Sequence, residues 1–240
     1  MSGTDLEARE GRLLERLESY QEEVLEFTRE LIATDSANPP GDERAVAGMI
    51  VERLRELGIE DVETMGPEVD RPSVIACVNG DSPGPRLILS GHIDTKPAGD
   101  MEAWKSDPWD PLVREGRLYG LGSGDMKAAV AAMIYAAAGL QGIGLPAGSL
   151  QLVLTADEEA GSVKGAKWMA DQGLLSADAA IIGEPSGITT EWEALHLVSR
   201  GAALFRIVVR GTQMHSSITD RLPSVNASVK MAELMVRMNN

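Results

Sequence analysis

The sequence predicts an α/β fold in which a mainly parallel central sheet is flanked by helices. Short apolar runs typical of buried strands alternate with longer segments in which apolar residues recur at helical spacing. Turn-forming glycine, proline and aspartate separate the two kinds of segment. From residue 188 onward the order changes to two strand-like runs and a helix, which predicts the start of a second, α+β unit.

Two helices are predicted before the first strand. Leucine and valine recur at helical spacing from the N-terminus to Asn38-Pro39-Pro40-Gly41, where two prolines and a glycine forbid continuation. We expect one long helix over this region. The second helix is predicted from Glu43 to Leu57, with Gly58 as its C-cap.

Apolar runs predict four strands, at Val74–Val78, Leu87–Leu89, Leu150–Leu154 and Ala179–Ile182, and the second of these is expected to be buried. The second and third strands are separated by a long irregular stretch, Lys96–Gly124, and by a helix of small residues that begins near Asp125. Loops of that length inside compact domains tend to carry function. A further helix, Ser162–Ala170, precedes the last strand.

The region after the fourth strand predicts two paired strands, Leu195–Val198 and Ala203–Val209, and then a helix that starts near Ser224 and continues to Asn240. We therefore predict two domains, 1–187 and 188–240. Two strands and one partial helix would leave an apolar face and a sheet edge uncovered, so we expect the second domain to be incomplete.

Composition narrows the class of protein. The 240 residues carry a formal net charge of −15, which argues against nucleic acid as a partner, because binding to nucleic acid requires neutralisation of phosphates. We expect no apolar run long enough to span a bilayer, and the acidic N-terminus does not resemble a secretory leader. The single cysteine, Cys77, lies in an apolar run, which predicts a buried thiol in a reducing, cytoplasmic setting.

Histidine and acidic side chains follow the predicted strands, or stand where the next element starts: His92 with Asp94, Asp125, Glu158 with Glu159, and Glu184. The carboxyl ends of the strands in an open α/β sheet form one crevice, so we expect these groups to converge. Acids packed together repel one another unless a cation lies between them. Histidine with carboxylates suits zinc, or manganese or cobalt, and two metals about 3.5–4 Å apart can activate one water.

Each of these groups also has a simpler interpretation. His92 and Asp94 could form only a hydrogen-bonded pair, and Asp125 only a helix N-cap. Asp157-Glu158-Glu159 could be a solvated acidic turn, and Glu184, before a proline, a loop residue. The ordered combination of all four groups is what favours a metal site.

Four segments carry a resemblance to a known family: Ser90–Thr95, Gly122–Lys127, Ala156–Gly161 and Gly183–Ser186. In order and spacing they resemble the metal-site motifs of the di-zinc amidohydrolases, which include acetylornithine deacetylase, succinyl-diaminopimelate desuccinylase, aminoacylase and the glutamate carboxypeptidases. The resemblance implies a zinc exopeptidase-like catalytic domain for 1–187. For 188–240 it implies the start of a lid and dimerisation domain, through which two chains would form a homodimer.

The resemblance also implies a set of metal ligands. His92 and Glu184 would bind the first metal, Asp125 would bridge both metals, and Glu159 would bind the second. The complete site would hold two Zn²⁺ ions, or Co²⁺ or Mn²⁺. The family supplies a further histidine to the second metal near its C-terminus, and the histidines of this chain are His92, His196 and His215, none of which matches it.

The implied catalytic residues are three. Asp94 would orient His92 from behind, and Glu158 would act as general base, moving a proton from the attacking water to the leaving amine. His215 would stabilise the oxyanion from the partner subunit of the dimer. The implied activity is hydrolysis of an amide bond in an N-acyl amino acid or small peptide, with no membrane partner.

Two features depart from the family pattern. The missing last histidine and the partial lid predict that the 240 residues are a fragment of a longer enzyme. The alternative is a truncated, non-catalytic homologue that acts as a metal-binding or association module. Lys96 stands where the family more often has an apolar residue, and it could place a positive charge near the site or simply be solvated.

Overall fold

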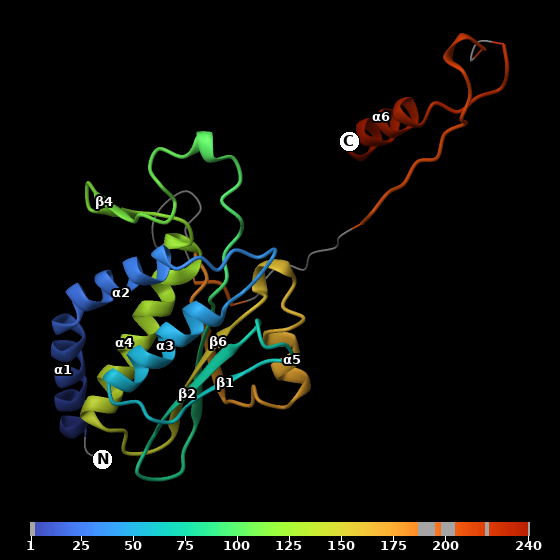
Figure 1. The fold of residues 1–240 in the computed structure, drawn as a ribbon. Helices are drawn as coiled ribbons and strands as arrows, with labels where there is room; N and C mark the ends of the chain where they lie inside the picture. Colours follow the sequence, from blue (N-terminus) through green and yellow to red (C-terminus); the bar gives the residue numbers. More distant parts are fainter. Residues whose placement is uncertain (1–2, 187–194, 198–204, 219–220, 240) are drawn as a thin grey trace. The chain divides into compact units, whose positions relative to one another are not determined.

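The computed structural model describes residues 3–186, 195–197, 205–218 and 221–239. Its contacts divide the chain into two compact units, Met1–Glu193 and Ala194–Asn240, and each is described by itself below (Figure 1). The assignment of a catalytic domain to 1–187 and a lid to 188–240 stays a prediction.

The first unit is built on a five-stranded sheet with the order β1-β2-β6-β3-β7. The strands are β1 (Val62–Met65), β2 (Ser73–Asn79), β3 (Arg86–His92), β6 (Ser149–Thr155) and β7 (Ala179–Ile182). β6, β3 and β7 run parallel, whereas β1 and β2 are antiparallel to their neighbours. The α/β class with a central sheet flanked by helices is confirmed, but the sheet is mixed rather than mainly parallel.

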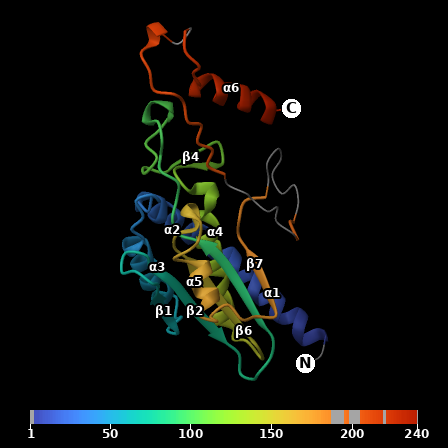
Figure 2. The ribbon, with the colours of Figure 1, turned by 90° about the vertical axis from the view of Figure 1, so that its right-hand side faces the viewer.

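The register of the parallel strands sets the position of the site. His92 pairs with Thr155 across β3 and β6, and Ser90 pairs with Ile182 across β3 and β7. The residues that follow these three strands therefore leave the sheet at the same edge, as expected for the carboxyl ends of parallel strands. Figure 2 shows these strands in a second view, with β7 at the end of the sheet.

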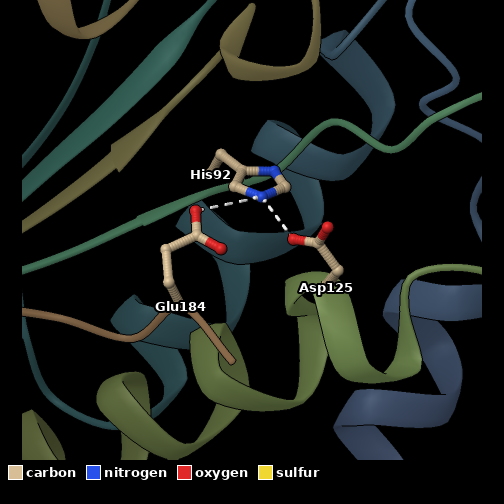
Figure 3. Close-up of side chains that lie close together, drawn as sticks. All are labelled: His92, Asp125 and Glu184. Atoms are coloured by element: carbon tan, nitrogen blue, oxygen red, sulfur yellow. Dashed lines mark hydrogen bonds and ion pairs between the residues drawn. The ribbon is translucent and has the colours of Figure 1, made fainter. Parts of the chain in front are cut away.

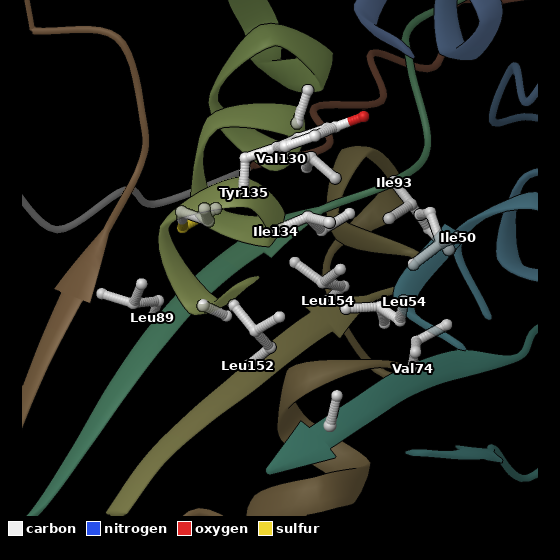
Figure 4. Close-up of a cluster of buried hydrophobic side chains, with 14 of the residues drawn as sticks. Ile50, Leu54, Val74, Leu89, Ile93, Val130, Ile134, Tyr135, Leu152 and Leu154 are labelled. Carbon is white, nitrogen blue, oxygen red and sulfur yellow. The ribbon is translucent and has the colours of Figure 1, made fainter. Parts of the chain in front are cut away.

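Helices cover both faces of the sheet (Figure 1). α3 (Arg44–Glu56) and α4 (Ala128–Ile143) pack on one face, with α1 (Gly3–Ser19) and α2 (Gln21–Ala33) packed against α4, and the short α5 (Ala166–Asp171) covers the other face. The alternation of strand side chains explains the two cores: Leu152 and Leu154 face α3 and α4, whereas Val153 faces α5 (Figure 4). Cys77 on β2 was expected to be buried, but the structure shows a free thiol that is only half-buried. This partial burial raises the pKa of the thiol.

The expected N-terminal helix is two helices, which is a correction to the sequence interpretation. The break lies at Tyr20, between α1 and α2. The Ser19 hydroxyl donates to the carbonyl of Arg16 at 2.7 Å, a local bond that competes with regular helix geometry. Tyr20 also packs edge-on against Tyr135 of α4, with ring centroids 5.2 Å apart.

The central helix, α4, bears on a second expectation, namely that no apolar run in this chain is long enough to span a bilayer. The segment Ser123–Ile143, with mean hydropathy 1.3, is long and apolar enough by length and composition to cross a membrane. However, 56% of that window is buried inside the protein, and α4 packs on α1, α2 and the sheet. Its many alanines allow neighbouring elements to approach closely on several sides. A helix that is apolar and buried in this way is a core helix of the protein.

Three short strands escaped the sequence analysis: β1, and a hairpin of β4 (Leu112–Arg114) and β5 (Arg117–Tyr119) inside the stretch expected to be irregular. None of the three contains an apolar run of the kind that marks a buried strand. In β1, for example, Val62 is the one buried residue. The helix expected at Ser162–Ala170 begins only at Ala166.

The second unit contains α6 (Ala227–Met238), which begins close to the expected position. The Asn226 side chain caps it by accepting from the backbone N–H groups of Ser228 and Val229. The two expected strands are wrong where they can be checked: residues 195–197 and 205–209 are not in strands, and residues 198–204 lie outside the described part. The Leu195 and Phe205 side chains are exposed, and an isolated strand pair without a packed face is marginal in water.

Candidate metal centre

His92 is the last residue of β3 and is buried. The chain packs closely at the glycine before it, because a Cβ on Gly91 would lie 2.5 Å from Met126 Cε and 2.8 Å from Met133 Cε, so both methionine side chains would have to shift. This close approach lets the backbone N–H of His92 donate to Met126 Sδ at 3.2 Å. The turn that carries Asp125 is thus held directly against the end of β3.

Three predicted ligands converge on one ring nitrogen. His92 Nε2 lies 2.9 Å from Asp125 Oδ1 and 3.5 Å from Glu184 Oε1 (Figure 3). Asp125 comes from the irregular turn Ser123–Lys127 before α4, and Glu184 follows β7 by two residues. One potential ligand atom from each residue lies within 4.8 Å of the others. This is the geometry expected of a site that holds one metal ion.

The electrostatics of the group favour a cation. Burial opposes protonation of His92, but its hydrogen bonds with Asp94 and Asp125 and the charge of Glu184 raise its pKa to about 9. The pKa of Glu184 is raised by burial and by the charge of Asp125, against the opposing effect of His92. The site therefore combines one imidazole nitrogen with two carboxylates whose negative charges attract a cation. A divalent metal ion fits this set and would take the place of the imidazole proton.

Asp94 organises the residues behind His92. Its backbone carbonyl lies 2.9 Å from His92 Nδ1, and its Oδ1 lies 3.5 Å from the same atom. An Nδ1–H directed at this carbonyl leaves Nε2 free to face the acids. The buried carboxylate also accepts the backbone N–H of Glu158 at 3.2 Å and of Glu159 at 3.0 Å. Burial acts to raise the pKa of Asp94, but hydrogen bonds with His92, Asn38 and the backbone N–H of Glu159 hold it below its usual value.

A buried polar network lies behind Asp94, and sequence analysis missed most of it. Asn38 Nδ2 donates to Asp94 Oδ2 at 2.8 Å, and Arg71 donates to Asn38 Oδ1 at 3.1 Å. Arg71 also forms an ion pair with buried Glu43, at 2.7 Å. Asn38 begins the Asn38-Pro39-Pro40-Gly41 segment that ends the predicted N-terminal helix, and nothing in the local sequence distinguishes Arg71 or Glu43.

The turn after β6 carries the two adjacent glutamates. It follows Asp157, whose backbone is left-handed with φ of 64°, and it forms the 3-10 turn Glu158–Ala160. Burial and the charges of Glu159, Asp94 and Asp125 raise the pKa of Glu158, while His92 opposes the rise. Glu159 is not part of the three-ligand group in the described chain; its carboxylate lies 2.9 Å from Lys96 Nζ.

Lys127 fixes the turn that carries Asp125. Its side chain is buried, and Nζ donates to the carbonyls of Leu31 and Thr34 at 2.7 and 2.8 Å. Burial lowers its pKa to about 8. The lysine thereby ties the site to the C-terminal end of α2, a role that sequence analysis did not predict.

His215 lies in the second unit, and its relation to the other site residues stays a prediction. Its Nδ1 accepts the backbone N–H of Ser217 at 3.2 Å and lies 2.8 Å from the Ser217 hydroxyl. A neutral ring in this arrangement carries its proton on Nε2, which makes that atom a donor. The side chain is exposed.

Comparison with known proteins adds an independent line of information. A model of the Peptidase family M20/M25/M40 matches residues 88–236, a range that contains all seven predicted site residues. The chain is 36% identical over 221 residues to succinyl-diaminopimelate desuccinylase of Stenotrophomonas maltophilia (strain R551-3), covering 89% of this chain and 57% of that protein. It is also 36% identical to the same enzyme of Leptothrix cholodnii, over 88% of this chain and 57% of that one. The chain thus spans little more than half the length of these relatives.

Solved structures show the same fold. An M20 family metallo-carboxypeptidase from Sulfolobus solfataricus aligns with a TM-score of 0.59 and 22% identity, over 69% of this chain and 38% of that one. Human carnosine dipeptidase 1 aligns with a TM-score of 0.60 and 22% identity, over 74% and 41%. A tripeptidase from Staphylococcus aureus aligns with a TM-score of 0.54 and 28% identity, over 68% and 43%.

Proposed function

This chain belongs to the Peptidase family M20/M25/M40, and from that premise we propose that it is a metal-dependent hydrolase of amide bonds. Its substrate would be an N-acyl amino acid or a small peptide. The similar proteins include a desuccinylase, a carboxypeptidase and a dipeptidase, all of which are named for cleavage of such bonds.

The observation that supports the proposal is the convergence of His92 Nε2 with carboxylate oxygens of Asp125 and Glu184 within 4.8 Å. This donor set fits zinc best, with Co²⁺ or Mn²⁺ as substitutes in the same geometry. A metal bound there would polarise the scissile carbonyl and lower the pKa of a water molecule. Asp125 would bridge to a second metal held by Glu159 in a complete site.

The protein's own residues would orient ligands and move protons. Asp94 fixes the His92 ring through Nδ1 and holds the 158–159 turn through its carboxylate. Glu158 would take a proton from the attacking water and pass it to the leaving amine. Its raised pKa suits this exchange, because a base whose pKa lies nearer the working pH both accepts and returns a proton readily.

Further parts of the proposal concern the protein's setting. We place it in the cytoplasm, with a small-molecule substrate and without nucleic acid or membrane partners, in keeping with its net charge of −15. We also propose a homodimer formed through the lid domain, 188–240, in which His215 of one chain stabilises the oxyanion formed in the other.

A Glu158→Gln variant tests the function. It should lose about 10²–10⁴-fold in turnover while its metal content and fold stay unchanged, because a general base contributes that much. The assay is a panel of N-acetyl amino acids, N-succinyl amino acids and dipeptides, with metal measured by elemental analysis. Glu60→Gln, at an exposed position, is the matched control and should keep full activity.

Two outcomes would contradict the proposal. Inactivity of the metal-loaded, full-length natural protein on the whole panel would remove the enzymatic function and favour a metal-binding or association module. Unchanged turnover in Glu158→Gln would be compatible with a hydrolase but would show that Glu158 is not its general base.

A further inference from the structure

Lys96 holds the carboxylate that a second metal would need. Its Nζ lies 2.9 Å from Glu159 Oε2, and its backbone N–H donates to Glu159 Oε1 at 3.1 Å. The same Nζ also contacts the main-chain oxygen of Glu159. Both carboxylate oxygens of Glu159 are therefore engaged by donors of one residue, and the Glu159 side chain is only 8% exposed.

The carboxylates of the three-ligand group (His92, Asp125 and Glu184) have a different partner from that of Glu159. Asp125 and Glu184 each form an ion pair with the His92 ring, and no lysine or arginine is recorded against their carboxylates in the described part of the chain. A metal ion that enters this group displaces no ammonium or guanidinium group. A metal ion that requires Glu159 must first displace Lys96.

We propose that Lys96 is an internal cation at the position of the second metal, so that the centre binds one divalent ion tightly and a second only weakly. The proposal rests on the proposed function, because it requires a first metal held by His92, Asp125 and Glu184. The Lys96 ammonium neutralises Glu159 and repels an approaching divalent ion. Its side chain is 61% exposed, so it has solvent to move into when a second ion binds.

The sequence supports the same inference. Lys96 follows His92-Ile93-Asp94-Thr95 directly, so the end of β3 supplies both the first ligand and the competing cation. Of the predicted ligands of the second metal, Asp125 also belongs to the first site and Glu159 is the one engaged by Lys96. Lys96 therefore competes for the carboxylate that distinguishes the second position from the first.

The test is a Zn²⁺ titration of the purified protein against chelators of known affinity, which gives the number of bound ions and their stepwise dissociation constants. Lys96→Met removes the charge and keeps the length of the side chain. It should tighten the second constant about tenfold and change the first much less, because the opposing unit charge lies close to the second position only. Lys96→Arg should keep the second site weak.

Lys167→Met is the matched control, since Lys167 pairs with Asp171 on an exposed helix surface and should leave both constants unchanged. Thermal unfolding of each variant checks that the fold is retained. Two equally tight ions on the wild-type protein, or an unchanged second constant in Lys96→Met, would overturn this inference and leave the proposed function intact. No bound zinc on any variant would overturn both.

Discussion

Replacement of Arg71 by methionine should destabilise the first unit strongly. The Glu43 side chain is 0% exposed and Arg71 is 7% exposed, with 2.7 Å between the paired atoms. Removal of the guanidinium leaves a buried carboxylate whose pKa is already raised by burial despite Arg71. Breaking a buried pair of this kind typically costs about 3–5 kcal/mol.

The loss in free energy of unfolding should appear as a lower thermal midpoint. For a unit of this size, each kcal/mol corresponds to a shift of about 2–4 °C, so we expect Arg71→Met to lower the midpoint by roughly 6–20 °C. Urea unfolding followed by circular dichroism gives the free energy directly. The matched control is Arg44→Met, because Arg44 pairs with Asp42 where both side chains are exposed. That change should cost less than about 1 kcal/mol.

A double variant separates the charge from the packing. Arg71→Met combined with Glu43→Met removes both charges and should recover a large part of the loss, because well-packed apolar residues often replace a buried pair at little cost. It should not recover all of it, since Asn38 Oδ1 and the Pro40 carbonyl also lose their donor. A cost for Arg71→Met no larger than that of Arg44→Met, or a double variant less stable than the single one, would refute this reasoning.

Three further predictions concern the site and the core. Asp94→Asn should weaken the affinity for the first metal about 10–100-fold, measured by chelator competition, because it removes the negative charge that lies 3.5 Å from His92 Nδ1 and disturbs the carboxylate that holds the 158–159 turn; an unchanged affinity would contradict that role. In metal-free protein, the His92 pKa of about 9 lies above its value in the unfolded chain. The folded state therefore binds more protons at His92, and its stability should fall as pH rises from about 6.5 to 8. Above pH 8 the buried Lys127, whose pKa is lowered to about 8, opposes this fall, because the folded state then binds fewer protons at the lysine than the unfolded chain does. Urea midpoints in the presence of a chelator test this, and His92→Gln should remove the fall. Leu154→Ala, at a fully buried position, should cost about 2–5 kcal/mol, whereas Leu14→Ala, which is 60% exposed, should stay within about 0.5 kcal/mol of wild type; equal costs would place Leu154 outside the core.

The strands that apolar runs mark were predictable, although β7, at the end of the sheet, is exposed along its whole length. Ala179–Ile182 has the predicted bounds, and β3 and β6 contain the predicted runs. β1 was missed because a short strand at the end of the sheet buries one residue, Val62, and leaves no run to detect. The break at Tyr20 was missed because leucine and valine recur at helical spacing on both sides of it, and the contact of Tyr20 with Tyr135 joins residues that are distant in the sequence.

The site was predictable to a different degree. The prediction that groups after parallel strands converge needs only their order in the sheet, and the structure brings His92, Asp125 and Glu184 together. Their roles as ligands stay predictions. The residues behind Asp94 could not be predicted, because an arginine such as Arg71 carries no local signal of burial. The pairing of Lys96 with Glu159 likewise depends on how two loops meet.

The wide separation of the three ligands along the chain has a consequence for biosynthesis. His92 leaves the ribosome well before Glu184, and β7 must pair with β3 before Glu184 can reach the histidine. At roughly 5–20 residues per second, translation of the intervening chain takes on the order of 5–20 s. The nascent polypeptide therefore presents isolated acidic motifs during this interval. If these residues bind the metal as predicted, metallation would be a late event, which would follow synthesis of β7 rather than guide the earlier strands into place.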